Sequence, residues 1–212
     1  MKQSTNTIDN DAETGANKPE RETSTRWLEQ RSFRIALTSI FIALSIVLGY
    51  MLIYIPNIEL ITVMIFLSGF VLGKKEGLIV GAFSSFIFCF FNPMGSSQLP
   101  LLTVQVVYYS LVGLIGAFTQ DLFKDKQFYK PKDDLYVYQI MGILGVIGGI
   151  LTTVYSIFSE FAGFITISAP GVPFSAYFLI GVPWTIIHVI GNILGFVFIV
   201  PGLIQLIHAL ID

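Results

Sequence analysis

The chain has 212 residues, of which 54% are hydrophobic and only 12% are charged. This composition excludes a soluble globular protein and indicates an integral membrane protein. The formal net charge is only −2, and no basic stripe with interleaved aromatic residues lies outside the membrane-proximal loops, so nucleic acid is not an expected partner.

The distribution of positive charge is strongly one-sided. The twelve Lys and Arg residues lie in residues 2–34, at Lys74 and Lys75, and in residues 124–132, whereas the alternate connections contain none. Cytoplasmic loops of membrane proteins carry an excess of Lys and Arg. The N-terminus, these two connections and the C-terminus are therefore expected to face the cytoplasm.

In chain order, residues 1–30 are predicted to form a disordered cytoplasmic tail, because they are polar and poor in apolar side chains. Residues 31–212 are predicted to form an all-α bundle of about six transmembrane helices of roughly 20 residues each. These helices are expected at residues 34–55, 59–73, 76–91, 99–123, 136–158 and 176–210. Residues 160–175 are expected to form an external loop, and Pro183 and Pro201 to kink the last helix.

Glycine pairs four residues apart recur along the expected helices. They are Gly69 and Gly73, Gly77 and Gly81, Gly145 and Gly149, and Gly191 and Gly195. In lipid, small residues at this spacing allow two helix backbones to approach closely. The pattern predicts a tightly packed bundle.

Two carboxylates, Glu59 and Glu160, are placed by this topology near the outer surface. A lone carboxylate at the membrane centre costs about 2.5–3.5 kcal/mol, and the outer half contains no Lys or Arg to pair with it. Each must be solvated, hydrogen-bonded, protonated or matched by a ligand. Contact with a ligand and contact with water at a helix end are both compatible with the sequence.

Trp184, His188 and Asn192 are spaced four residues apart and share one face of the last helix. An indole, an imidazole and an amide on one stripe suit a heterocyclic ligand. Alternatively, Trp184 is an interfacial residue, and His188 and Asn192 bond to neighbouring helices. With the two carboxylates, this stripe completes the predicted substrate-binding set, whose other members are outer-half amides and tyrosines: Asn57, Asn92, Gln98, Gln105, Tyr108 and Tyr155.

Patterns for catalysis and for metal binding are missing from the sequence. The segment Gly69–Lys74 has three residues between its glycines where a phosphate-binding loop has four. The two histidines, His188 and His208, lie far apart in depth, and no Gly-x-Ser-x-Gly motif occurs. We therefore expect no enzyme activity, no metal and no cofactor.

Several segments resemble the substrate-binding S component of energy-coupling factor transporters, over residues 34 to about 208. Residues 34–43 resemble the first helix of the family, with its Ala-x-x-x-Ala docking surface, although Ser39 stands at the first small position. The other segments that resemble the family are residues 56–62, residues 67–77, Asn92-Pro93-Met94-Gly95 followed by Gln105, and residues 181–192.

The resemblance implies a prokaryotic plasma-membrane protein whose six helices enclose an outward-facing pocket. Its ligand would be a vitamin or a vitamin precursor, bound by the 54–62 and 92–98 connections and by the outer halves of the last three helices. The resemblance also implies that Ala36, Ser39 and Ala43 dock on a transmembrane coupling subunit, which two ATP-binding subunits drive. The lipid bilayer is the remaining expected partner.

Two further hypotheses stand beside a substrate-binding transport subunit. One is a non-catalytic scaffold of the cell envelope or cell-shape machinery, which would bind no small ligand. The other is an intramembrane enzyme, for which no pair of nucleophile and base is visible. The aromatic and amide side chains suit a flat heterocycle. The outer carboxylates disfavour a strongly anionic ligand, although backbone N–H groups can also bind anions.

Overall fold

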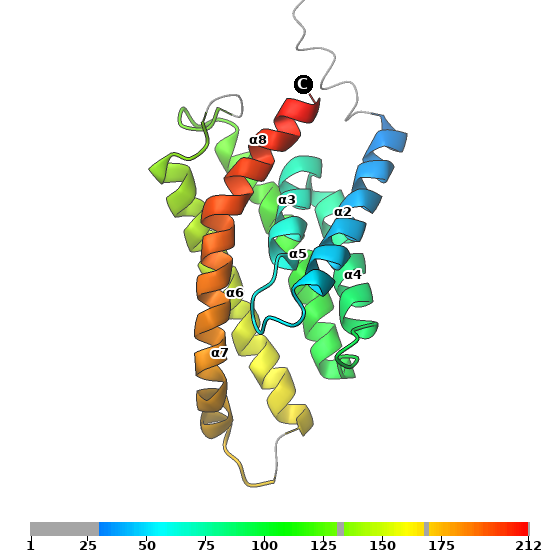
Figure 1. Ribbon diagram of the computed structural model, residues 1–212, viewed down its shortest axis with the longest axis vertical. Helices are drawn as coiled ribbons and strands as arrows, with labels where there is room; N and C mark the ends of the chain where they lie inside the picture. Colours follow the sequence, from blue (N-terminus) through cyan, green and yellow to red (C-terminus); the bar gives the residue numbers. More distant parts are fainter. Residues whose placement is uncertain (1–29, 131–133, 168–169, 212) are drawn as a thin grey trace, which may run out of the picture.

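The computed structural model describes residues 30–130, 134–167 and 170–211, which form helices joined by short connections (Figure 1). The elements are α2 (Arg31–Met51), α3 (Ile61–Leu72), α4 (Lys74–Phe90), α5 (Leu99–Phe123), α6 (Tyr138–Ile167), α7 (Phe174–Leu194), the π-helical turn η1 (Gly195–Ile199) and α8 (Val200–Ile211). No strand occurs in these ranges, and the all-α prediction is confirmed. The predicted disordered tail lies, apart from Gln30, outside the described residues.

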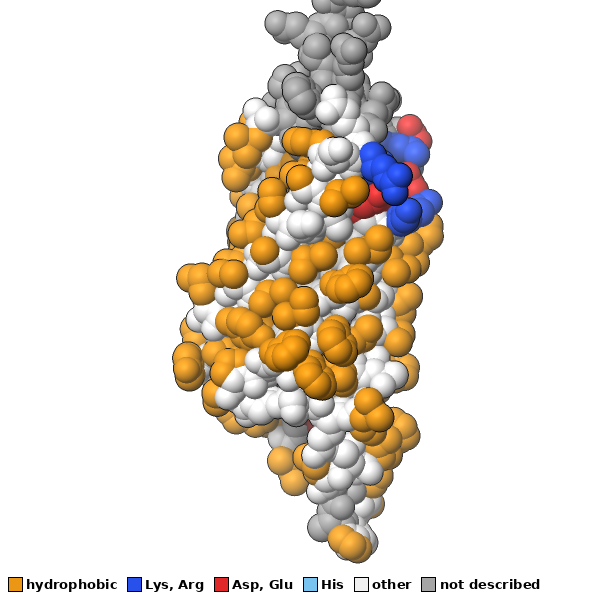
Figure 2. All heavy atoms as spheres, turned by 90° about the vertical axis from the view of Figure 1, so that its right-hand side faces the viewer, with side chains coloured by type: hydrophobic (Ala, Val, Ile, Leu, Met, Phe, Trp, Pro, Cys, Tyr) orange, Lys and Arg blue, Asp and Glu red, His pale blue; other side chains and the backbone are white. Residues whose placement is uncertain are grey.

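Within the described residues, four helical stretches are long and apolar enough to cross a membrane: Arg31–Met51, Leu99–Phe123, Tyr138–Ile167 and Phe174–Leu210. Large apolar side chains are exposed along them, and Figure 2 shows that Lys and Arg on this face gather at one end. An exposed apolar surface of this extent is stable only against lipid. The chain is a multi-pass membrane protein, whereas the count of six spans stays a prediction.

The helix α3 is the centre of the bundle. All of its residues except Val71 are buried, because the segment is apolar on every side. With 12 residues it is about 18 Å long, well short of the roughly 30 Å hydrocarbon core of a bilayer. The connection between α2 and α3 consequently lies at mid-height in the molecule (Figure 1).

Two predicted boundaries are wrong. The helix α6 continues to Ile167, so Glu160 belongs to a helix and not to the expected loop of residues 160–175. The sequence there stays apolar, and the first strong helix breaker is Pro170. At the other connection, α2 ends at Met51 and not near Ile55, because Pro56 has no N–H to donate to the carbonyl of Leu52, four residues earlier, and its ring would clash with that carbonyl in a helix.

Close backbone contacts join α3, α4 and α5. A Cβ atom at Gly69 would collide with the carbonyl of Gly113, and one at Gly113 with the carbonyl of Gly77. The helices α6 and α7–η1 approach in a different way, because Gly148 accommodates the ring of Phe196. Gly73 is not a packing residue: its φ of 98° forms the turn between α3 and α4.

The last helical stretch contains a π-helical turn just before Pro201. A proline has no N–H to donate to the carbonyl four residues earlier, and a wider turn is one way to accommodate this loss. Tyr136 donates its hydroxyl to the carbonyl of Phe198 at 2.8 Å, which satisfies one acceptor of this turn. Pro183, in contrast, lies within α7 without interrupting it.

Ion pairs concentrate at one end of the bundle. Arg34 contacts Glu76 at 2.6 Å and donates to the carbonyl of Leu72 at 2.9 Å, which ties α2 to the α3–α4 turn. Lys74 contacts Asp121 at 2.9 Å, between α4 and α5. The start of α2, the α3–α4 turn, the α5–α6 connection and the end of α8 all lie at this end (Figure 1).

The glycine contacts predict an asymmetry between two Gly→Ala substitutions. Gly113→Ala should lower the free energy of unfolding by about 2 kcal/mol or more, because the added methyl group meets a backbone carbonyl. Gly142→Ala, which meets no atom within 4 Å, should be neutral or stabilising because alanine favours the helix. Thermal unfolding in detergent measures both, and equal effects would contradict the packing described here.

Candidate functional site

A carboxylate lies at the start of the central helix. Glu59 precedes α3 and accepts a hydrogen bond from the backbone N–H of Thr62 at 3.2 Å and another from the Thr62 hydroxyl. The first N–H groups of a helix have no partner within it, and its N-terminus favours negative charge. The short helix thus holds Glu59 inside the bundle, where its side chain is only 16% exposed.

Two side chains of α7 reach the same carboxylate. The Nε2 atom of His188 lies 3.3 Å from Glu59 Oε1, and Asn192 donates through Nδ2 to the same oxygen at 3.4 Å. His188 and Asn192 are both buried, at 8% and 2% exposure. The contact joins residues more than a hundred positions apart, which helical spacing alone does not reveal.

Aromatic rings and an amide extend the site towards α5 and α6. The ring of Tyr155 lies 5.7 Å from that of His188 and 4.7 Å from that of Tyr108. Tyr109 packs on both tyrosines, and Gln105 donates to the Tyr155 hydroxyl at 3.3 Å. We call these residues the Glu59 cluster: Glu59, Thr62, Gln105, Tyr108, Tyr109, Tyr155, His188 and Asn192.

The cluster joins six of the predicted site residues and leaves five outside it. Asn57 is half-buried with a φ of 57°, Asn92 accepts the N–H of Met94 at 2.8 Å, and Gln98 is exposed just before α5. Glu160 lies against Gly181 of α7, and Trp184 is 52% exposed. The stripe of Trp184, His188 and Asn192 therefore divides into one exposed and two buried side chains.

The predicted set lacked two members of the cluster, Thr62 and Tyr109. The signal for Thr62 was the position of a hydroxyl three residues after a carboxylate, at the start of an apolar run, where the two groups can bond at a helix N-terminus. The pairing of His188 with Glu59 was also not predicted. No pattern within one helix could have revealed it, because the two residues come from different elements.

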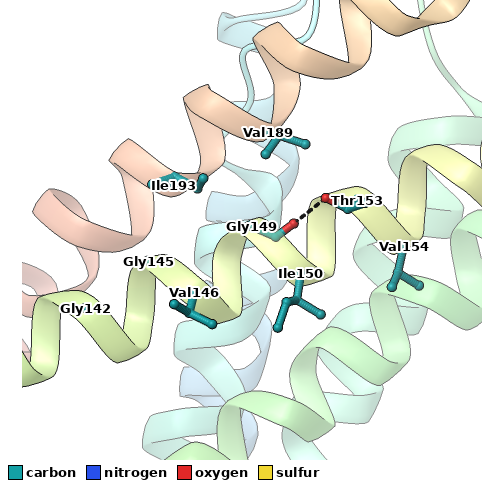
Figure 3. A pocket seen from close by; sticks show the side chains of 9 residues that line it. All are labelled: Gly142, Gly145, Val146, Gly149, Ile150, Thr153, Val154, Val189 and Ile193. Carbon is teal, nitrogen blue, oxygen red and sulfur yellow. Dashed lines mark hydrogen bonds between the residues drawn. The ribbon is translucent and has the colours of Figure 1, made fainter.

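An apolar groove of about 640 Å³ lies between α6 and α7 (Figure 3). Glycines and branched aliphatic side chains form its walls, and the hydroxyl of its one polar side chain, Thr153, already donates to the carbonyl of Gly149 at 2.8 Å. A polar ligand needs convergent polar groups to fix its orientation. The groove does not provide them, and the Glu59 cluster does.

The residues predicted to dock a partner lie on the outside of α2. Ala36, Ser39 and Ala43 are exposed. Ser39 also lines a groove of about 450 Å³ between α2 and α4, which Arg31 and Lys75 border at the charged end. The surface is free of bulky side chains at Ser39, whose hydroxyl donates to the carbonyl of Ile35 at 3.0 Å.

Comparison with known families identifies the kind of protein to which this site belongs. Residues 33–200 match the family described as the ECF transporter, substrate-specific component. No significant match is found among curated proteins or solved structures. The matched range covers most of the chain and includes every residue of the Glu59 cluster. The chain therefore belongs to the family of substrate-specific components of ECF transporters.

Proposed function

We propose that this protein captures a vitamin-like small molecule outside a prokaryotic cell and delivers it inward as the S component of an ATP-driven importer. The Glu59 cluster is its binding site. The observation that carries this proposal is the set of buried polar groups at the N-terminus of α3, which includes a carboxylate, an imidazole and an amide, whereas the other buried polar side chains of the described residues are serines and threonines. Polar groups inside a membrane protein are costly and usually serve a function.

The cluster has the composition of a binding site. Its tyrosines offer flat surfaces for stacking, and its amides and carboxylate offer hydrogen bonds. None of the eight cluster residues is a serine or cysteine that a base could activate. The predicted role is therefore binding without chemical conversion, and the scaffold alternative finds no support in the family match.

We further propose which subunits this protein contacts and how it is oriented in the membrane. A transmembrane coupling subunit would dock on α2 around Ala36, Ser39 and Ala43, and two ATP-binding subunits would drive it. The small residues and the groove beside Ser39 support a close helix contact there. Six membrane-crossing segments would place both termini and the charged end in the cytoplasm, as the distribution of Lys and Arg predicts.

The first test removes the charge at the centre of the site. Glu59→Gln should weaken binding of the substrate about 10- to 100-fold, because a hydrogen bond to a charged group contributes about 1.5–3 kcal/mol. Equilibrium binding of the compound that co-purifies with the wild-type protein measures the effect. Asp125→Asn, at an exposed position near the charged end, is the control. Equal affinity of both variants for the substrate would show that Glu59 does not contribute to binding.

The second test separates binding from transport. Ser39→Leu should leave substrate binding intact and abolish uptake into cells, because a bulky side chain prevents the close approach of a partner helix. Ser39→Ala should transport normally. Thr153→Leu, at an exposed position of α6, controls for added surface bulk. Normal uptake by Ser39→Leu would refute docking at this surface.

The third test addresses orientation. A membrane-impermeant maleimide applied to intact cells should label Ser96→Cys, in the α4–α5 connection, and should not label Asp125→Cys until the cells are opened. The native Cys89 is buried and should stay unlabelled in both preparations. The reverse pattern would place the charged end outside.

A further inference from the structure

The carbonyl oxygen of the Asn192 side chain is buried, and none of the described residues pairs with it. Its Nδ2 atom faces Glu59 Oε1 at 3.4 Å and the carbonyl of His188 at 3.5 Å. Two oxygens that face each other repel, so the carboxylate fixes the direction in which this amide points. The Oδ1 atom is then the open end, and it has no hydrogen-bond partner among the described residues. The residue is 2% exposed, and a buried acceptor in this state is costly.

A second amide of the cluster, on α5, also has an oxygen without a hydrogen-bond partner among the described residues. Gln105 donates to the Tyr155 hydroxyl at 3.3 Å, and its Oε1 atom is buried without a partner in the described part of the chain. If the amide were flipped, its oxygen would face the Tyr155 hydroxyl and its Nε2 atom would be the one without a partner among the described residues. Tyr155 also packs on His188, so the open ends of Gln105 and Asn192 belong to one polar cluster.

The charge of the cluster restricts what can fill it. Glu59 is its carboxylate, and His188 can at most neutralise that charge. The sequence has no Lys or Arg between residues 35 and 73, between 76 and 123, or after 132. An anionic ligand would therefore bring a second negative charge close to Glu59 without a permanent cation to offset it.

We propose that the site takes a small molecule without net negative charge, which donates an N–H or O–H group to Asn192 Oδ1 and offers a second polar group to the Gln105 amide. This inference rests on the proposed function and narrows its substrate class. It also explains why the side-chain oxygens of both amides are buried without a partner among the described residues, although buried polar groups are usually hydrogen-bonded.

Mass spectrometry of the small molecules that denaturation releases from the purified full-length protein tests this class. The wild-type protein should release a neutral or cationic compound with at least one N–H or O–H donor. Asn192→Leu should retain at least tenfold less of it. The melting temperature of the ligand-free variant should stay within a few degrees of wild type, because the substitution also removes an unpaired acceptor. Asp125→Asn should retain the compound at the wild-type level.

Each other outcome has a separate meaning. A released carboxylate or phosphate compound would overturn the proposed ligand class and leave the transport function intact. Full retention of a neutral compound by Asn192→Leu would also overturn the class, because Asn192 would then not contact the ligand. The proposed function itself fails if two results occur together. The wild-type protein would release no more of any compound than Glu59→Gln does, and cells that produce the wild-type protein would take up no vitamin-like compound.

Discussion

The structure depends on a carboxylate held at the N-terminus of a central helix that is too short to cross a bilayer. Because α3 stops after 12 residues, the preceding connection enters the bundle and places Glu59 beside His188 and Asn192. The N–H groups of the first helical turn favour a negative charge at this point. A full-length helix would have carried Glu59 towards the membrane surface, away from His188 and Asn192.

Charge is handled differently at the charged end of the bundle and at its mid-height. Near the α3–α4 turn, Arg34, Glu76, Lys74 and Asp121 form ion pairs at the water-accessible end of the helices. At mid-height, the Glu59 carboxylate is balanced by hydrogen bonds and by an imidazole. Surface ion pairs are individually weak, whereas a buried carboxylate is stable only when its oxygens are satisfied. The proposed binding site depends on the second arrangement.

Much of the architecture could be predicted from local sequence patterns. The range 99–123 of α5 was predicted to the residue, because Pro93, Gly95 and the charged segment after Phe123 delimit it. Six side chains of the Glu59 cluster were named, since polar residues are rare in the outer half. Their assembly could not be predicted, because it depends on where α3 begins and on how α7 packs. The end of α6 was missed because the loop expected around Pro170 and Pro173 was drawn back to Glu160, although a helix can carry a carboxylate beside a glycine such as Gly181.

The glycine contacts between α3, α4 and α5 have a mechanical consequence. Where backbone meets backbone, as at Gly69, Gly77 and Gly113, no side chain is available to change rotamer and yield. These three helices therefore form a block with very little compressibility. Any change in volume when the interior fills or empties must be taken up at boundaries made of side chains, such as the one between Tyr108 of α5 and Tyr155 of α6.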